Sequence, residues 1–250
     1  MSVVTKICNS IHNLKKYLHN DWDVSVIPEL SVTEIDALYG QSVPQTPGMP
    51  SFGLCSACNL TLCHRELPSH KLHVIFYNFG EKNSTPPKVT KTCGGKIQSL
   101  YNNEIISRDD SLIIIFQCPV TENISKTIED IYIDGQEKLK IDNLSDEVLH
   151  ENESIDEPYR ITHFRNIHAF YLDHLSVDIT THHSVPPHEP IRKEAEIQQI
   201  LNTCNATLDQ LPRIMRNDAQ AKCLRLAPGD ICKINRISSV GETTSYRVCV

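Results

Sequence analysis

The residues best suited to chemistry are cysteines and histidines that begin at position 55. Cys55 and Cys58 form a Cys-x-x-Cys pair, and Cys63 and His64 follow shortly after. Thiolate and imidazole ligands at such spacing can close a tetrahedral zinc site. The first hypothesis is therefore zinc held by Cys55, Cys58, Cys63 and His64, and the alternative is free thiols in a loop. Further possible ligands lie downstream at His70, His73 and Cys93.

Other catalytic chemistry finds little support in the sequence. A redox role for Cys55 and Cys58 would require a pair that follows a strand and opens a helix, and the preceding Pro50 and Gly53 do not predict that context. A Gly-rich phosphate loop, a nucleophile elbow and paired catalytic carboxylates are all missing from the sequence. An enzyme dependent on cysteine or zinc is kept as an alternative function, and the sequence predicts no catalytic residue.

Composition limits the classes of partner. The chain has 250 residues, 40% of them hydrophobic, and a formal net charge of -7. This is enough apolar material for a core, but a free-standing nucleic-acid binder usually carries a basic excess. Any contact with DNA therefore requires a local patch or a larger assembly.

The sequence also bears on the compartment. The longest apolar run, Leu112 to Phe116, is far shorter than the roughly 20 residues of a membrane span. The segment from Met1 to Cys8 lacks the apolar stretch of a signal peptide. We therefore expect a protein that is not secreted and does not contact membranes, with its ten cysteines reduced or bound to metal.

The sequence pattern of residues 1–177 predicts an α/β domain. Apolar residues spaced by three and four predict a helix from Val3 to Leu18, and Ser31 with Glu34 predicts a capping box for a second helix that ends at Gly40. Residues 41–71 are rich in Pro, Gly, Ser and Cys and predict a loop, and the pairs Pro86-Pro87 and Gly94-Gly95 bracket another predicted loop. Buried strands are expected at Val74–Tyr77 and Leu112–Phe116, with a helix over 125–131.

Residues 136–160 are strongly acidic. Two interpretations compete: a docking tract for a basic partner, or a solvated surface insertion. We favour the insertion, because runs of charge mostly face water. The acidic residues are Glu137, Asp142, Asp146, Glu147, Glu151, Glu153, Asp156 and Glu157.

Residues 178–250 predict a smaller α+β domain. The alternation around Leu175, Val177 and Ile179 predicts a strand, and apolar spacing predicts a helix over 197–204. Asp218 is a predicted cap for a short helix, and Pro228-Gly229 is a predicted turn. Two β segments, 231–237 and 243–250, predict a terminal hairpin.

An ordered set of short motifs runs through this last part. Thr181-His182-His183-x-Val185-Pro186-x-His188 precedes the predicted helix, and Leu208-Asp209-Gln210-Leu211-Pro212-Arg213-Ile214-Met215-Arg216-Asn217-Asp218 follows it. Leu226-Ala227-Pro228-Gly229-Asp230-Ile231-Cys232-Lys233-Ile234-x-Arg236 and Ser245-Tyr246-Arg247-Val248-Cys249 complete the set. The order and spacing over residues 178–250 closely resemble the assembly domain of the fifth subunit of eukaryotic RNA polymerases and its archaeal counterpart.

The resemblance is weaker upstream. Eukaryotic members open with a jaw domain, absent from archaeal ones, whose first helix contains a Leu-Lys-x-Tyr element; Leu14-Lys15-Lys16-Tyr17 is similar to it. The cysteine-rich loop and the acidic insertion have no counterpart in that pattern. Ala219 stands where the family usually has Pro, and the chain is longer than the usual eukaryotic subunit. Such divergence favours a copy from a large DNA virus over a divergent protist copy.

The resemblance implies a non-catalytic subunit of a DNA-dependent RNA polymerase, with a jaw lobe beside the downstream DNA and an assembly lobe on the largest subunit. It implies partner contacts at Arg213, Arg216, Lys233, Tyr246 and Arg247, with Arg213 and Arg216 projecting from a connector stiffened by Pro212. A structural role also remains open for these residues: Tyr246 could belong to the core, and Arg213 to an internal salt bridge. The edge of the terminal hairpin is expected to be available to a strand of another chain.

The resemblance also implies structural turns at His182, His183, Pro186, Pro212 and Gly229. A metal site at His182, His183 and His188 is disfavoured, because adjacent residues of a strand point to opposite faces.

Neighbouring small subunits are further expected partners, and no independent homo-oligomer is expected. DNA contact, if any, would be non-specific and to the backbone, with a face at Lys15, Lys16, Lys88 and Lys91. The expected location is the nucleus or, for a viral copy, the virion and host cytoplasm. A free regulatory protein with the same assembly fold is a further alternative.

Overall fold

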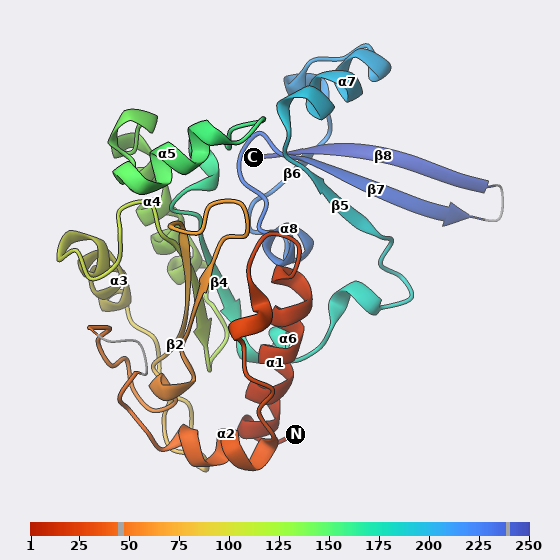
Figure 1. Cartoon of the computed structure of the whole chain (residues 1–250). Helices are drawn as coiled ribbons and strands as arrows, with labels where there is room; N and C mark the ends of the chain where they lie inside the picture. The colour runs from red at the N-terminus through yellow and green to blue at the C-terminus, as the bar shows by residue number, and fades with distance from the viewer. Residues whose placement is uncertain (45–47, 239–240) are drawn as a thin grey trace.

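The computed structural model describes residues 1–44, 48–238 and 241–250, and it is an α+β protein with two sheets. We call residues 1–177 the N-lobe and residues 178–250 the C-lobe. Figure 1 shows the N-lobe sheet flanked by helices, with the long hairpin of the C-lobe projecting away from it. In the described ranges, no helix combines the length and apolar character needed to cross a membrane.

The N-lobe sheet has the order β1-β2-β3-β4. Its strands are β1 (Leu60–Cys63), β2 (Lys71–Tyr77), β3 (Ser111–Phe116) and β4 (Ile167–Tyr171). β2, β3 and β4 are parallel, and β1 pairs antiparallel with β2 at one edge. Parallel strands are covered on both faces, which explains why the central strand is a continuous apolar run. The predicted strands at 74–77 and 112–116 are confirmed.

Two predicted helices cover one face of this sheet. α1 (Val3–Leu18) and α2 (Val32–Tyr39) have the expected bounds, and Ser31 and Glu34 form the expected capping box. The apolar stripe of α1 packs with residues of β2 and β3 in one core cluster. A short helix after β4, α6 (Leu172–Leu175), joins the same cluster.

The opposite face is covered by α3 (Thr92–Asn102) and α4 (Glu122–Lys138), which share a second core cluster with β2, β3 and β4. The loop predicted between Pro86-Pro87 and Gly94-Gly95 is present but ends earlier than expected, because both glycines lie inside α3. A Cβ on Gly94 would lie 2.6 Å from Cγ2 of Thr127. Glycine therefore serves close helix packing here, at a cost in helix propensity of about 1 kcal/mol.

The acidic stretch folds onto the N-lobe. It contains α5 (Asp146–Ser154), and its apolar residues Leu139, Leu144 and Val148 form a third cluster with Leu67 and Phe164. Most of its carboxylates are exposed. This geometry fits the solvated insertion, with an apolar side that anchors it.

Two further predictions from local pattern are wrong. The region 41–71, predicted as loop, contains β1 and a 3₁₀ turn at Ser56–Cys58. The strand expected over 175–180 is the end of α6 followed by the 3₁₀ turn Ile179–Thr181. Leu175 packs against α1 while Val177 is exposed, so tertiary contact with α1 overrides a short alternation. The remaining 3₁₀ turns are Val24–Val26, Ile141–Asn143, Ile161–His163 and Leu208–Gln210.

The C-lobe sheet has the order β5-β7-β8-β6. Its strands are β5 (His188–Ile191), β6 (Arg213–Ile214), β7 (Ile231–Ser238) and β8 (Gly241–Cys249). The predicted hairpin is confirmed as β7 and β8, and the predicted helices as α7 (Glu194–Cys204) and α8 (Ala219–Cys223), the latter capped by Asp218. Cys223 of α8 packs in the core cluster of the N-lobe, so the two lobes share apolar contacts.

Candidate docking surface and the ionic seam behind it

The hairpin is longer than the sheet that supports it. β7 pairs with β8 from Ile231 to Ser238, but β5 pairs only with residues 231–234 of β7, and β6 only with Val248 and Cys249 of β8. Among the described residues, the outer edges of 235–238 and 242–247 have no further strand neighbour. The hairpin accordingly extends into open space in Figure 1. Such an edge offers unpaired backbone groups to another chain, and it lies where the sequence predicted one.

Lys233 and Tyr246 are cross-strand neighbours near the base of this hairpin. The Lys233 ammonium lies 2.9 Å from a carboxylate oxygen of Glu189 on β5. Tyr246 is half-buried and packs against an apolar cluster that α7 forms with the base of the hairpin. Lys233 thus has a partner on the surface, and Tyr246 contributes to the lobe's own packing.

Arg213 and Arg247 meet at the β6 edge. Arg213 is exposed, and the Arg247 guanidinium donates to the carbonyl of Arg213 at 3.3 Å. Neither side chain forms a salt bridge within the described part of the chain. Met215, 63% exposed, follows in the same connector. We call Arg213, Met215 and Arg247 the docking patch.

The expectation that Arg216 projects outward is wrong, because its side chain is 2% exposed. It stacks over the Tyr132 ring of α4 at 3.7 Å and bonds both carboxylate oxygens of Glu129 at 3.1 and 3.2 Å. It also donates to the Asn166 side chain and to the carbonyl of Ile167. After β6 the chain turns toward the N-lobe, so Arg216 joins the two lobes instead of reaching a partner.

The open edge of β4 is where the lobes meet. Carbonyl oxygens of Asn166, Ile167 and Ala169 accept hydrogen bonds from Arg225, Arg216 and Lys222, respectively. Cations of the C-lobe thus cover an edge that could otherwise pair with another strand. We call this region of contact between the two lobes the seam. It was not predicted from the sequence; the signal available was a group of basic residues over 213–225 with few acids near them in sequence.

Asp230 is the centre of the seam. It is fully buried and accepts from Arg160 and His163 of the N-lobe and from the backbone N–H of Ala227. Arg192 lies 3.7 Å away and also pairs with Asp21. Burial acts to raise the pKa of Asp230, but His163, Arg192 and the hydrogen bonds outweigh it and hold that pKa below its usual value.

Of the predicted turn residues, His182 and His183 belong to one turn and Gly229 to another, whereas Pro186 and Pro212 lie outside turns, before β5 and β6. The backbone N–H of Val185 bonds to the carbonyl of His182, and Pro186 supplies the carbonyl that lies 2.6 Å from His188 Nδ1. Exposed His182 and His183 place their rings 4.4 Å apart. Pro212 lies before β6, and its carbonyl accepts from Val248.

Gly229 is required by both conformation and space. Its φ is +91°, and a Cβ there would lie 2.7 Å from Nη1 of Arg160. We expect Gly229→Ala to lower the free energy of unfolding by about 2 kcal/mol, measured by urea denaturation. Gly40→Ala is the control: its φ is -71° and nothing lies near the added carbon, so stability should hold or rise slightly. Equal losses in both variants would contradict this role of Gly229.

The four lysines proposed to face DNA come from two sides of the N-lobe sheet. Lys15 and Lys16 lie on α1, where they pair with Glu29 and Asp178. Lys91 immediately precedes α3 on the other face, and Lys88 lies just before it in the chain. The structure therefore does not gather the four into one basic face.

The structure does not bring all four predicted zinc ligands together. Cys55 and Cys58 are buried in the core, while Cys63 is exposed at the end of β1. His64 Nδ1 accepts from the backbone N–H groups of Glu66 and Leu67, which leaves that nitrogen occupied. In the described ranges, no three cysteine, histidine or acidic side chains gather in a way that could hold a metal ion.

The similarity to known proteins lies in the C-lobe. The family model described as "RNA polymerase Rpb5, C-terminal domain" matches residues 177–249. Subunit Rpo5 of the DNA-directed RNA polymerase of Methanococcus maripaludis strain C7 is 40% identical over 73 residues, which are 29% of this chain and 92% of that protein. The Rpo5 subunits of Methanosphaera stadtmanae and Sulfolobus acidocaldarius are 40% and 37% identical over 75 residues, or 30% of this chain and 96% and 88% of theirs. The chain therefore belongs to the Rpb5/Rpo5 family of DNA-directed RNA polymerase subunits.

Proposed function

We propose that this chain is a non-catalytic subunit of a multisubunit DNA-dependent RNA polymerase and docks on the largest subunit through its C-lobe. The match of the C-lobe to nearly the whole length of archaeal subunits carries this proposal. The open hairpin edge and the docking patch give the lobe a surface for it. No convergent set of catalytic groups was predicted, and function as a small assembly module requires none.

Two groups of residues would make the docking contacts: arginines at the β6 edge and residues near the base of the hairpin. Arg213 and Arg247 present guanidinium groups that suit bidentate contact with partner carboxylates. Lys233 and Tyr246 stand near the base of the open hairpin, where a partner strand could pair. Arg216, which follows Met215 in the chain, is buried and pairs with Glu129 of α4, and this contact holds the connector against the N-lobe.

The N-lobe is proposed as the jaw beside the downstream DNA. Since the chain has a net charge of -7, it would contact DNA only inside the assembly, where other subunits supply the positive field. Lys88 and Lys91 are exposed and form no salt bridge within the described residues, so they suit a backbone contact better than Lys15 and Lys16. A large DNA virus remains our proposed source, with the virion and host cytoplasm as location and the nucleus as the cellular alternative.

An enzyme dependent on cysteine or zinc is not favoured. Its proposed ligands do not converge, and the thiols of Cys55 and Cys58 are buried in the core, where a substrate cannot reach them. A free regulatory protein with the same fold is an outcome that the following experiment separates.

The test is affinity purification of the tagged chain from its native cells or virions, with co-purifying proteins identified by mass spectrometry. We expect the double variant Arg213→Ala/Arg247→Ala to lower recovery of the largest subunit at least about tenfold. Tenfold corresponds to about 1.4 kcal/mol, and a hydrogen bond to a charged group contributes about 1.5–3 kcal/mol.

The control for this experiment is Lys126→Ala/Lys138→Ala, which removes two exposed positive charges from α4. It should leave recovery unchanged. Elution of the wild-type chain as a free small protein would refute the polymerase role. Equal recovery in the two double variants would refute only the docking patch.

A further inference from the structure

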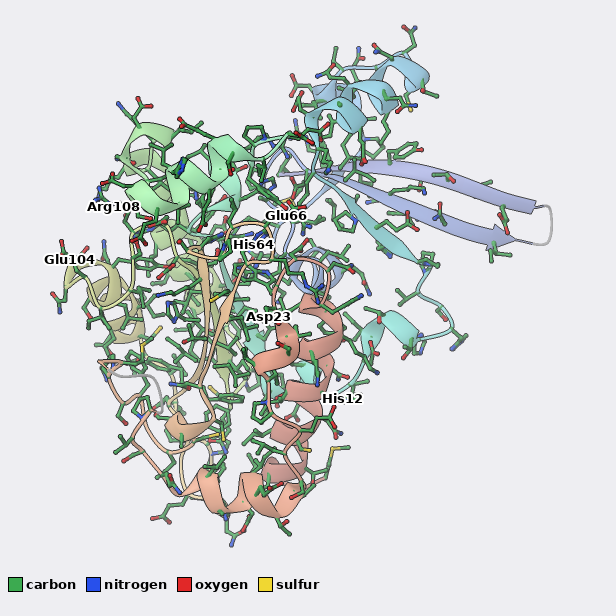
Figure 2. All side chains as sticks on the ribbon, in the orientation of Figure 1. His12, Asp23, His64, Glu66, Glu104 and Arg108 are labelled. Atoms are coloured by element: carbon green, nitrogen blue, oxygen red, sulfur yellow. The ribbon has the colours of Figure 1, made fainter. Side chains whose placement is uncertain are left out.

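A small polar cavity lies in the seam between the lobes. It measures about 30 Å³ and is lined by both lobes, including Trp22, His64, His70 and Arg225. This volume holds one or two water-sized groups. Figure 2 places His64 and Glu66 near the centre of the molecule, where the β1–β2 connection meets the C-lobe.

The cavity has a route to solvent. A groove of about 310 Å³ lies beside it and shares Asp21, His64, Tyr159 and Arg192 with its lining. A small ion could therefore enter without unfolding of either lobe.

The lining offers hydrogen-bond donors in excess. His64 is 6% exposed and its Nδ1 accepts two backbone N–H groups, so the ring proton lies on Nε2. Within the described part of the chain, neither this N–H nor the indole N–H of Trp22 has an acceptor. His70, 3% exposed, bonds Ser111 through Nε2 only. A water molecule among such donors would leave its own hydrogens poorly paired.

The same site holds a positive charge that is not paired directly with a carboxylate of the described residues. Arg225 is buried, and its donors reach only the carbonyls of Leu112 and Asn166 and the ring of His168. Its Nε has no hydrogen-bond partner, and no carboxylate lies within salt-bridge distance of it among the described residues. Burial lowers the pKa of Arg225 to about 9, with the neighbouring Arg216 charge acting in the same direction, and the side chain remains charged at neutral pH.

The carboxylates nearby are already engaged. Asp21 pairs with Arg192 at 2.7 Å, and Asp230 accepts from Arg160 and His163. A buried charge that lacks a counter-ion is unfavourable, and an ion that only accepts hydrogen bonds would offset this cost.

We propose that the interlobe cavity binds one small monovalent anion, chloride in solution, between the donors of His64 and Trp22 and the charge of Arg225. The anion would contact residues of both lobes and so stabilise their arrangement. Oxyanions such as phosphate exceed the volume of the cavity and are excluded.

The experiment is a thermal unfolding series on the full chain at pH 7.5 and constant ionic strength, with chloride or bromide exchanged for gluconate. Chloride and bromide should raise Tm in a saturable manner, by about 3–6 °C at ten times the Kd, while gluconate should not. Crystals grown in bromide should show one anomalous peak in the cavity.

Variants test the assignment of the donors. His64→Asn retains an acceptor for the backbone N–H groups but removes the Nε2–H donor, and it should weaken chloride binding at least fivefold. His12→Asn on the exposed side of α1 is the matched control and should leave binding unchanged (Figure 2). Equal Tm values in chloride and gluconate, or bromide found only outside the cavity, would overturn the proposal even if a variant fails to fold.

Discussion

Replacing Asp230 with alanine should lower the free energy of unfolding by about 3–5 kcal/mol, since removal of one partner leaves buried charges without compensation. Arg160, His163 and Arg192 all lie within 4 Å of this carboxylate. The measurement is urea denaturation followed by the fluorescence of Trp22. This is the only tryptophan of the chain, and it lies in the same seam.

Two variants determine whether the effect comes from charge at this site. Asp230→Asn retains the shape and part of the hydrogen bonding, so its loss should be smaller than that of Asp230→Ala. Asp209→Ala removes an exposed carboxylate from the same lobe and should change stability by less than about 0.5 kcal/mol. A loss below about 1 kcal/mol for Asp230→Ala would show that the seam does not depend on this residue.

Mild acid is expected to destabilise the protein through buried histidines. Burial lowers the pKa of His64 to about 4, and burial also holds the pKa values of His70 and His168 well below the usual value. His168 has one ring nitrogen 2.9 Å from Arg225 and the other 3.4 Å from Arg216. Both partners are donors only, so a protonated ring has no acceptor there.

The sign of the effect follows from proton uptake. The unfolded chain binds protons on these histidines near pH 6.5, whereas the folded chain does so only at lower pH. Stability therefore falls as pH decreases from 6.5 toward the folded pKa. For His64 alone, the loss between pH 7.5 and pH 5 is about 2 kcal/mol. The stabilisation that Asp230 provides is lost only at pH values below this window, because its folded pKa lies below the usual value of a carboxylate.

The measurement is the free energy of unfolding from urea titrations at pH 7.5 and pH 5. His64→Asn cannot be protonated, so the difference between the two pH values should shrink by about 2 kcal/mol. His12→Asn, at an exposed position, should retain the full difference. If stability were the same at both pH values in the wild type, the buried neutral histidines would not control it.

Much of the architecture could be predicted from local signals. The capped helices α1 and α2, the apolar strand β3, the Asp218 cap and the β7–β8 hairpin all depend on periodicity or turn chemistry within short segments. Family membership was likewise visible from the ordered motifs of the C-lobe.

The errors share one physical cause. The glycines of α3 serve close contact with α4, and Leu175 packs against α1, so both depend on partners distant in sequence. Cysteine spacing likewise does not tell where the thiols lie: Cys55 and Cys58 are buried together, whereas Cys63 is exposed at the end of β1.

The sequence by itself determined that this chain contains an Rpb5/Rpo5 assembly domain behind a larger α/β lobe, because helix caps, hydrophobic periods and turn residues are local properties. Only the tertiary structure decided which arginines face outward. Arg213 lies at the surface while Arg216, three residues later, is buried against Glu129. The burial and pairing of Arg216 depend on residues of the other lobe that lie 48 to 87 positions away, and no local pattern records them.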